Sequence, residues 1–289
     1  MTKPKLSFWQ IWNLSFGFLG VQIGYSLQNS NTSSIFESLG ADVSHLSYFW
    51  LAAPLAGMIV QPIVGLFSDG TWTRWGRRIP YILGGSLIST LALVLMPNCP
   101  KLLAFAPLAM GAFILLFMDL SFNVTMQPFR ALVADMLDDS QKTQGYVVQT
   151  FLINLGAVVG AILPLVMTWL GVSDEAAPGH VSPHIAYSYY AGGAILLLTV
   201  LVTSFKTREY PPAEFARYNN LSGEDAKPMS FAGLMRNVPG VMVRLGVTQF
   251  FSWAALFLMW TYLKPAITGV VTDHATGEVL SAGATQTWV

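Results

Sequence analysis

The chain has 289 residues, of which 53% are hydrophobic and only 10% charged, whereas an average soluble domain is about 25% charged. Together with a mean hydropathy of +0.52, this composition excludes a soluble globular core and indicates a membrane protein. The formal net charge is zero, which by itself says nothing about partners, and no nucleic acid partner is expected. The single cysteine, Cys99, excludes an internal disulfide and a cysteine metal cluster.

Long stretches without a charged residue predict the membrane-spanning helices. Each can supply the ~20 apolar residues that cross a bilayer core. In chain order they cover residues 6–36, 43–68, 79–100, 102–118 (continuing past Asp119 to 129), 143–173, 176–205 and 245–263. The expected fold class is therefore an all-α membrane protein with seven helices. Gly156 and Gly160 form a small-xxx-small pair in the fifth of them, which predicts a close contact with another helix.

The distribution of Lys and Arg predicts the orientation. With the N-terminus inside, only Lys101 and Lys264 fall outside, and the other 13 of the 15 basic residues lie on or near the inner side. Cytoplasmic loops carry the excess of Lys and Arg in membrane proteins. The sequence therefore predicts a multi-pass protein in the lipid bilayer of the inner (plasma) membrane, with a cytoplasmic N-terminus.

Composition along the chain predicts four parts. Residues 1–205 form an N-terminal six-helix transmembrane domain, and the polar, proline-rich residues 206–239 form a cytoplasmic loop. A seventh transmembrane helix follows at 240–265, and residues 266–289 form an extracytoplasmic tail. This is the layout of a transporter with two six-helix halves. On this interpretation the chain is truncated after helix 7, its partner is a missing C-terminal half, and it is expected to be inactive alone.

The loop after the second helix, GLFSDGTWTRWGRRIP at 65–80, combines a carboxylate with three arginines. Topology alone could explain the basic residues. A carboxylate beside arginine at the membrane surface can also form an ionic latch, which breaks and reforms when two halves of a transporter rock. The candidate latch residues in this loop are Asp69, Arg74, Arg77 and Arg78.

The fourth helix contains FMDLSFNVTMQPFRALVAD at 117–135. At 100° per residue, Asn123 and Arg130 fall within about 40° of Asp119, so the three share one face. A rise of ~16 Å separates Asp119 from Arg130, too far for a direct ion pair. A charge at the bilayer centre costs at least about 2.5–3.5 kcal/mol, so this face is expected to line a cavity, with Asp119 as a proton site. The alternative is a buried Asp that a neighbouring helix satisfies, without a role in transport.

These motifs carry a family resemblance. The spacing G-x-x-x-D-x4-R-x-G-R-R resembles the loop 2–3 signature of the major facilitator superfamily, in the stretched form of the sucrose transporters and the glycoside–pentoside–hexuronide symporters. The stretch from Asp119 to Asp135 is similar to the helix 4 signature of sucrose transporters, and GVQIGYSLQNS at 20–30 resembles their helix 1. The resemblance covers essentially the whole chain and looks most like bacterial maltose or maltooligosaccharide transporters.

The resemblance implies a major facilitator fold, here the N-terminal six-helix bundle plus the first helix of the C-terminal half. It implies proton-coupled (or sodium-coupled) symport of a neutral disaccharide, maltose or a related glucoside, by alternating access, without a cofactor or metal. In this family the residue matching Asp119 couples proton movement, and the one matching Arg130 contributes to sugar binding or coupling. We assign Asp135, at the end of the signature, to the latch.

Neutral amides and aromatic rings suit a neutral sugar, and the chain offers both within its helices. The first helix carries three such residues at i, i+3 and i+7, on one face. The candidate substrate-binding residues are Arg130, Asn123, Gln22, Tyr25, Gln28, Asn29, Gln149 and Trp253. Each of the amides can instead form a hydrogen bond between helices.

Three other functions are considered. A non-transporting seven-helix protein, such as a receptor or retinal protein, is disfavoured because the N-terminus is inside and Lys264 lies at the end of the seventh helix. An enzyme is not expected, because the sequence has no Ser/His/Asp set, H-E-x-x-H motif, phosphate loop or Cys/His cluster. A transporter of the same fold for a drug or a peptide stays open.

Overall fold

The computed structural model describes residues 3–41, 52–177, 179–219, 233 and 238–270. It divides into two compact units, Met1–Pro228 and Met229–Val289. In chain order the helices are α1 (Phe8–Ser38), α3 (Ala52–Gly70), α4 (Ile79–Leu95), η2 (Met96–Asn98), α5 (Cys99–Leu102), α6 (Pro107–Met136), α7 (Asp139–Trp169), α8 (Pro183–Lys206), α9 (Pro212–Tyr218) and α11 (Gly240–Val270).

Local sequence signals explain where the long helices begin. Ser7 and Gln10 form a capping box at the start of α1, in which each side chain bonds the other residue's backbone. Asp138 accepts a hydrogen bond from the backbone N–H of Ser140 and so caps α7. A proline begins both α6 and α8, where its missing N–H costs no helical hydrogen bond. These caps set the helix starts to within a residue or two.

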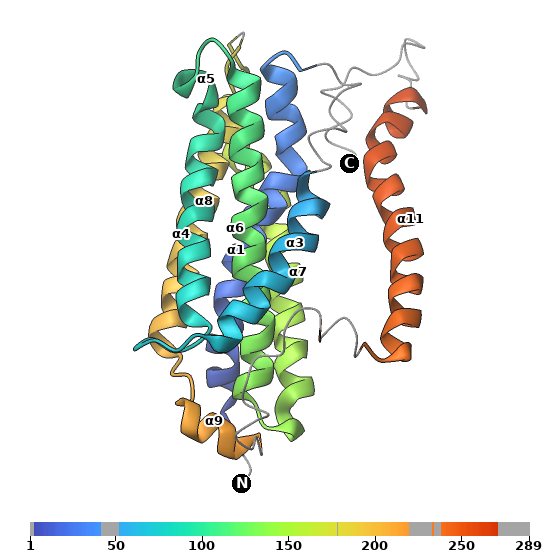
Figure 1. Ribbon diagram of the computed structural model, residues 1–289. Helices are drawn as coiled ribbons and strands as arrows, with labels where there is room; N and C mark the ends of the chain where they lie inside the picture. The colour runs from blue at the N-terminus through green and yellow to red at the C-terminus, as the bar shows by residue number, and fades with distance from the viewer. Residues whose placement is uncertain (1–2, 42–51, 178, 220–232, 234–237, 271–289) are drawn as a thin grey trace. The chain divides into compact units, whose positions relative to one another are not determined.

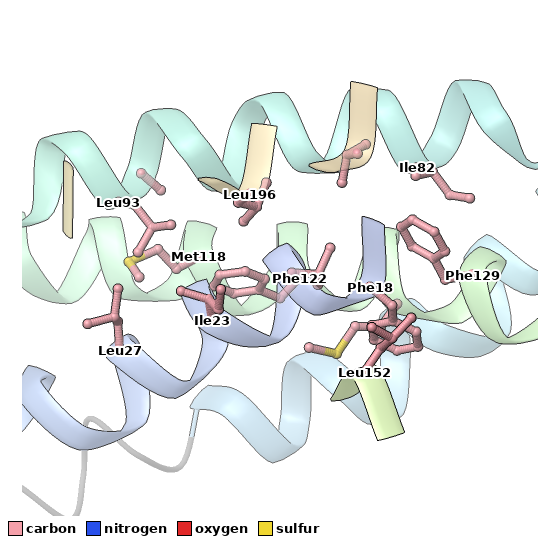
Figure 2. Packing of buried hydrophobic residues seen from close by; sticks show 14 of the residues in the cluster. Phe18, Ile23, Leu27, Ile82, Leu93, Met118, Phe122, Phe129, Leu152 and Leu196 are labelled. Carbon is pink, nitrogen blue, oxygen red and sulfur yellow. The ribbon is translucent and has the colours of Figure 1, made fainter. Parts of the chain in front are cut away.

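In the first unit the long helices run side by side (Figure 1). The helix α1 packs along α7 and α8, while α6 packs against α3 and α4, and α4 also contacts α8. Aromatic side chains fill the space between α1 and α6, where Phe18 and Phe129 stack with ring centroids 5.4 Å apart. Figure 2 shows these two rings with Phe122 inside the same buried cluster. This packing determines which faces of α1 and α6 meet.

Two glycines of α7 let it approach α1 closely. A Cβ on Gly156 would collide with the backbone oxygen of Leu19, and one on Gly160 would lie 2.6 Å from the backbone oxygen of Ile23. Only a residue without a side chain fits at such distances. The predicted close helix contact of this small-xxx-small pair is therefore confirmed.

The six spans expected in the N-terminal domain correspond to α1, α3, α4, α6, α7 and α8. The observed boundaries differ from the predicted charge-free intervals. Because charged residues lie inside the helices, α6 continues to Met136 and α7 begins at Asp139, while α8 begins only at Pro183. Four described stretches are long and apolar enough to cross a membrane, namely Ile79–Leu102, Pro107–Met136, Asp139–Trp169 and Pro183–Lys206. The helix α1 matches its predicted interval but carries many amides and hydroxyls.

The polar region predicted at 206–239 contains the short helix α9, and much of its remainder lies outside the described residues. The described part of the second unit consists mainly of α11, which begins at Gly240 as the sequence predicts but ends at Val270, five residues later than expected. Of the tail predicted at 266–289, residues 271–289 lie outside the described residues.

Candidate functional site

Asp119 lies deep in the first unit, with only 1% of its surface exposed. The helix α6 carries it against α1, where the Nε2 atom of Gln28 donates a hydrogen bond to its Oδ1 atom at 2.5 Å. Gln28 is itself fully buried. Two helices that are far apart in sequence thus bring a carboxylate and an amide into direct contact in the apolar core.

Asn123 lies one turn after Asp119 and links α6 to α3. Its Nδ2 atom donates to the backbone oxygen of Asp119 at 2.8 Å, and its Oδ1 atom accepts from Nε2 of Gln61 at 2.6 Å. Gln61 is a half-buried amide that sequence reasoning missed. The sequence signal that could have identified Gln61 is a lone amide within an apolar helix, beside Pro62. This chain of amides connects the backbone at Asp119 to a partly open surface.

Arg130 occupies a different environment from Asp119. It is exposed, and within the described part of the chain it forms no ion pair. The expectation that Asp119 and Arg130 do not pair directly agrees with this arrangement. The face of α6 therefore runs from a buried acid, through the half-buried Asn123, to an exposed cation.

The other candidate sugar contacts are dispersed. On α1, Gln22 and Tyr25 are half-buried and Asn29 is exposed, and the ring of Tyr25 meets that of Phe122 edge-on at 5.7 Å. On α7, Gln149 is buried and donates to the backbone oxygen of Phe129 at 3.2 Å. Trp253 is exposed on α11, in the second unit. Sugar binding by these residues stays a prediction.

Four of the five predicted latch residues converge between α3, α4 and α6. Arg78 contacts Asp69 at 2.5 Å and Asp135 at 2.9 Å, and it also donates to Oγ of Ser68 at 2.6 Å. Arg77 contacts the same oxygen of Asp135 at 2.6 Å. We call Asp69, Arg77, Arg78 and Asp135 the latch cluster, and the end of the bundle that carries it the latch end. Its conformational role stays a prediction.

Arg74 does not join the latch cluster. Thr73 and Gly76 exchange two backbone hydrogen bonds of 3.0 Å, which hold Arg74 and Trp75 at the tip of a tight turn. The guanidinium of Arg74 lies 5.6 Å from the centre of the Trp75 ring. Gly76 has φ of 114°, a left-handed conformation that favours glycine. The turn therefore points one arginine to solvent and directs the next two inward.

The segment after α8 adds a group that no sequence pattern predicts. Glu209 accepts hydrogen bonds from the backbone N–H groups of Arg78 and Ile79, at 2.8 and 2.9 Å. These groups at the start of α4 have no partner within the helix. Burial raises the pKa of Glu209, although the hydrogen bonds oppose the rise. Phe215 of α9 lies 4.2 Å from the guanidinium of Arg77, so this segment supports the latch cluster from one side.

Among the described residues, no three His, Cys, Asp or Glu side chains are grouped as a metal site requires. The chemistry available is therefore that of a buried acid–amide contact, a chain of amides and an ionic cluster. Such groups can bind a proton and polar hydroxyls, and can change conformation.

The chain is similar to known transporters over most of its length. The family model described as MFS/sugar transport protein matches residues 35–270. The general alpha-glucoside permease of Schizosaccharomyces pombe is 26% identical over 283 residues, which cover 91% of this chain and 48% of the permease. The sucrose transport protein SUC4 of Arabidopsis thaliana is 28% identical over 259 residues, covering 82% of this chain and 50% of SUC4.

The sucrose transport protein SUT1 of Oryza sativa subsp. japonica is 27% identical over 267 residues, covering 83% of this chain and 49% of that protein. The chain spans about half the length of the curated relatives it matches. These relatives are named as permeases or transport proteins, in agreement with the prediction of a non-enzyme. The matches confirm the resemblance that the loop and helix 4 motifs predict, and with it the fold class.

Proposed function

This chain belongs to the MFS/sugar transport protein family, and from that premise we propose that it forms one half of a proton-coupled symporter for a neutral disaccharide. It is a multi-pass membrane protein of that fold. The printed names of its relatives, sucrose and alpha-glucoside transporters, support maltose or a related glucoside as the cargo. Transport by alternating access is assigned to the assembly of two six-helix halves.

The observation that carries the proposal is the buried Asp119 on an apolar helix. An ionisable residue within a membrane span is expensive and marks a functional site by default. Its contact with Gln28 joins α1 to α6, and a change in its protonation alters the charge held between them. Asp119 is therefore assigned as the proton-coupling residue.

The cargo assignment rests on the polar groups near this acid. The linked amides of Gln61 and Asn123 offer donors and acceptors without net charge, which suits sugar hydroxyls. Arg130 on the same helix is exposed and free of ion pairs among the described residues. A transporter for a charged cargo would be expected to carry more charged residues within its spans. On this face of α6, Arg130 is the one cation, which favours a neutral cargo.

The latch cluster gives the transporter a way to hold one conformation. In this family the substrate site lies between two halves that rock against each other. We assign the latch end to the cytoplasmic side of the inner membrane, with a cytoplasmic N-terminus, because basic residues concentrate there. Opening on that side would break or rearrange the ion pairs of Arg78.

Uptake of radiolabelled maltose and sucrose tests the proposal. The chain is produced in cells that lack disaccharide uptake, either alone or with residues 1–239 joined to the second half of the fission yeast permease. We expect uptake only from the two-half protein, and its loss when a protonophore is added. Uptake that resists the protonophore would contradict proton coupling, and transport of a labelled drug or peptide but of neither sugar would contradict the cargo.

Asp119→Asn in the two-half protein tests the proton assignment. We expect the variant to exchange sugar down its gradient but to lose accumulation driven by a pH gradient, because the amide cannot release a proton. Asp174→Asn, in an exposed loop, is the matched control and should accumulate sugar like the parent. Normal accumulation by Asp119→Asn would remove Asp119 from the coupling mechanism.

A further inference from the structure

Gln28 and Asp119 each have one acceptor atom without a partner. Their contact uses Nε2 of the amide and Oδ1 of the carboxyl group. The other two oxygens, Oε1 of Gln28 and Oδ2 of Asp119, are buried and accept no hydrogen bond within the described part of the chain. Two orphan acceptors thus belong to the same two planar groups that already touch.

A single proton can satisfy both atoms. An ionised carboxylate only accepts hydrogen bonds, whereas a protonated carboxyl group carries one O–H donor. A proton on Oδ2 can be donated to Oε1, so that acid and amide are joined by one hydrogen bond in each direction. Without that proton, two buried oxygens stay unsatisfied, which native structures avoid. We propose that Gln28 is a positioning residue for the proton on Asp119, with its Oε1 atom accepting a hydrogen bond from the protonated carboxyl group.

The same geometry argues against sodium as the coupling ion. In transporters with discontinuous helices, backbone carbonyls released by an unwound segment help to coordinate sodium. Here α1 is continuous from Phe8 to Ser38 and α6 from Pro107 to Met136. Their backbone oxygens around the site are therefore used within the helices. The site offers two orphan oxygens, which suit one proton better than a metal ion that needs several ligands.

Among the described residues, no cation forms an ion pair with Asp119. Of the titratable groups on α1, the hydroxyl of Tyr25 interacts electrostatically with both Asp119 and Arg130, while Glu37 lies in the last turn. The helices α3 and α4, which also pack on α6, contribute Asp69 and Tyr81, both at the latch end. Of the cations on α5 and α7, Lys101 lies in the last turn of α5 and Lys142 pairs with Asp139. Arg130 is eleven residues along α6, ~16 Å away by helical rise. Protonation is thus the available way to remove the buried charge.

The role of this pair in coupling rests on the proposed function, whereas the proton site itself does not. Infrared difference spectroscopy of the full chain in lipid nanodiscs, recorded between acid and alkaline buffer, tests the site directly. The protonated side chain contributes a carboxylic acid carbonyl band, which Asp119→Asn should abolish. In Gln28→Leu we expect the band to shift to higher wavenumber, because the O–H loses its acceptor and the carbonyl its donor.

Asn31→Leu is the matched control, since it removes another buried amide of α1, one that bonds the backbone oxygen of Leu27. It should leave the band in place. An identical band in Gln28→Leu and the parent protein, or loss of the band when sodium is added at constant pH, would overturn the proposal. If the band behaves as expected while the two-half protein shows no proton-dependent uptake, the proposed function fails and the proton site stands.

Discussion

Replacing Asp135 by alanine should destabilise the first unit far more than replacing Asp69. Asp135 accepts charge-assisted hydrogen bonds from both Arg77 and Arg78, and its side chain is 18% exposed against 48% for Asp69. Arg78 is 7% exposed, so it depends on its partners rather than on water. Removal of Asp135 leaves Arg78 in contact with Asp69 and Ser68, and leaves Arg77 beside the ring of Phe215.

The magnitude follows from these exposures. Removing one partner of a buried ion pair costs about 3–5 kcal/mol, but Asp135 is partly solvated and Arg78 keeps its contacts with Asp69 and Ser68. We therefore expect a loss of about 2–3 kcal/mol in the free energy of unfolding for Asp135→Ala, and about 0–1 kcal/mol for Asp69→Ala. At roughly 2–4 °C per kcal/mol for a domain of this size, the melting temperature falls by about 4–12 °C in the first case.

The protein carries its own reporter for this assay. Cys99 is the single cysteine and is fully buried, so a thiol-reactive dye labels it only when the bundle opens. About 30 Å of helical rise separates it from Arg78, and local opening at the latch end does not expose it. Equal melting temperatures for Asp135→Ala and Asp69→Ala, in detergent at low salt, would refute the reasoning.

Three further outcomes follow from the same structure. Because burial raises the pKa of Glu209 above its usual 4.5, its contribution to stability is complete below that value and is lost as the pH rises through its folded pKa. The melting temperature of Glu209→Gln should therefore equal that of the parent protein near pH 4.5, and should be equal or higher at neutral pH. A lower melting temperature of the variant at neutral pH would contradict this. Gly160→Ala should lower the melting temperature because its Cβ meets the α1 backbone, whereas Gly84→Ala, with no atom within 4 Å of the added Cβ, should not. In the two-half protein, Gln61→Leu should raise the half-saturating sugar concentration about 5–10-fold, the effect of one lost hydrogen bond near 1 kcal/mol, and unchanged half-saturation would remove Gln61 from the sugar site.

Much of the fold could be predicted because helix formation in a membrane protein is a local matter. Charge-free runs of sufficient length identified α1, α4, α6, α7 and α8, although the starts of α6, α7 and α8 differ from the predicted intervals by four to seven residues. The position of Asp119 within an apolar helix was also visible in the sequence. Its spacing from Arg130 was enough to predict that the two do not pair directly.

The partners of these residues could not be predicted, because they come from other helices. Several amides on α1 were candidates for the sugar site, but the rotation and axial register of α1 against α6 decide that Gln28, 91 residues from Asp119, is the one that reaches it. The packing of α7 on α6 likewise buries Gln149 against the backbone oxygen of Phe129.

The loops show the same limit. Counting charges could not separate Arg74 from Arg78, because the turn closed by Thr73 and Gly76 decides which arginine faces solvent. Nor could it find Glu209, which lies 131 residues from the backbone that it caps. Composition determined that this chain forms apolar helices, and the spacing of Asp119, Asn123 and Arg130 determined that one of them carries a polar face. Side-chain packing between the helices, such as the contact of Gly160 with α1, determined which polar atoms meet. The register of two helices depends on the fit between both of their surfaces, so neither sequence segment determines it alone.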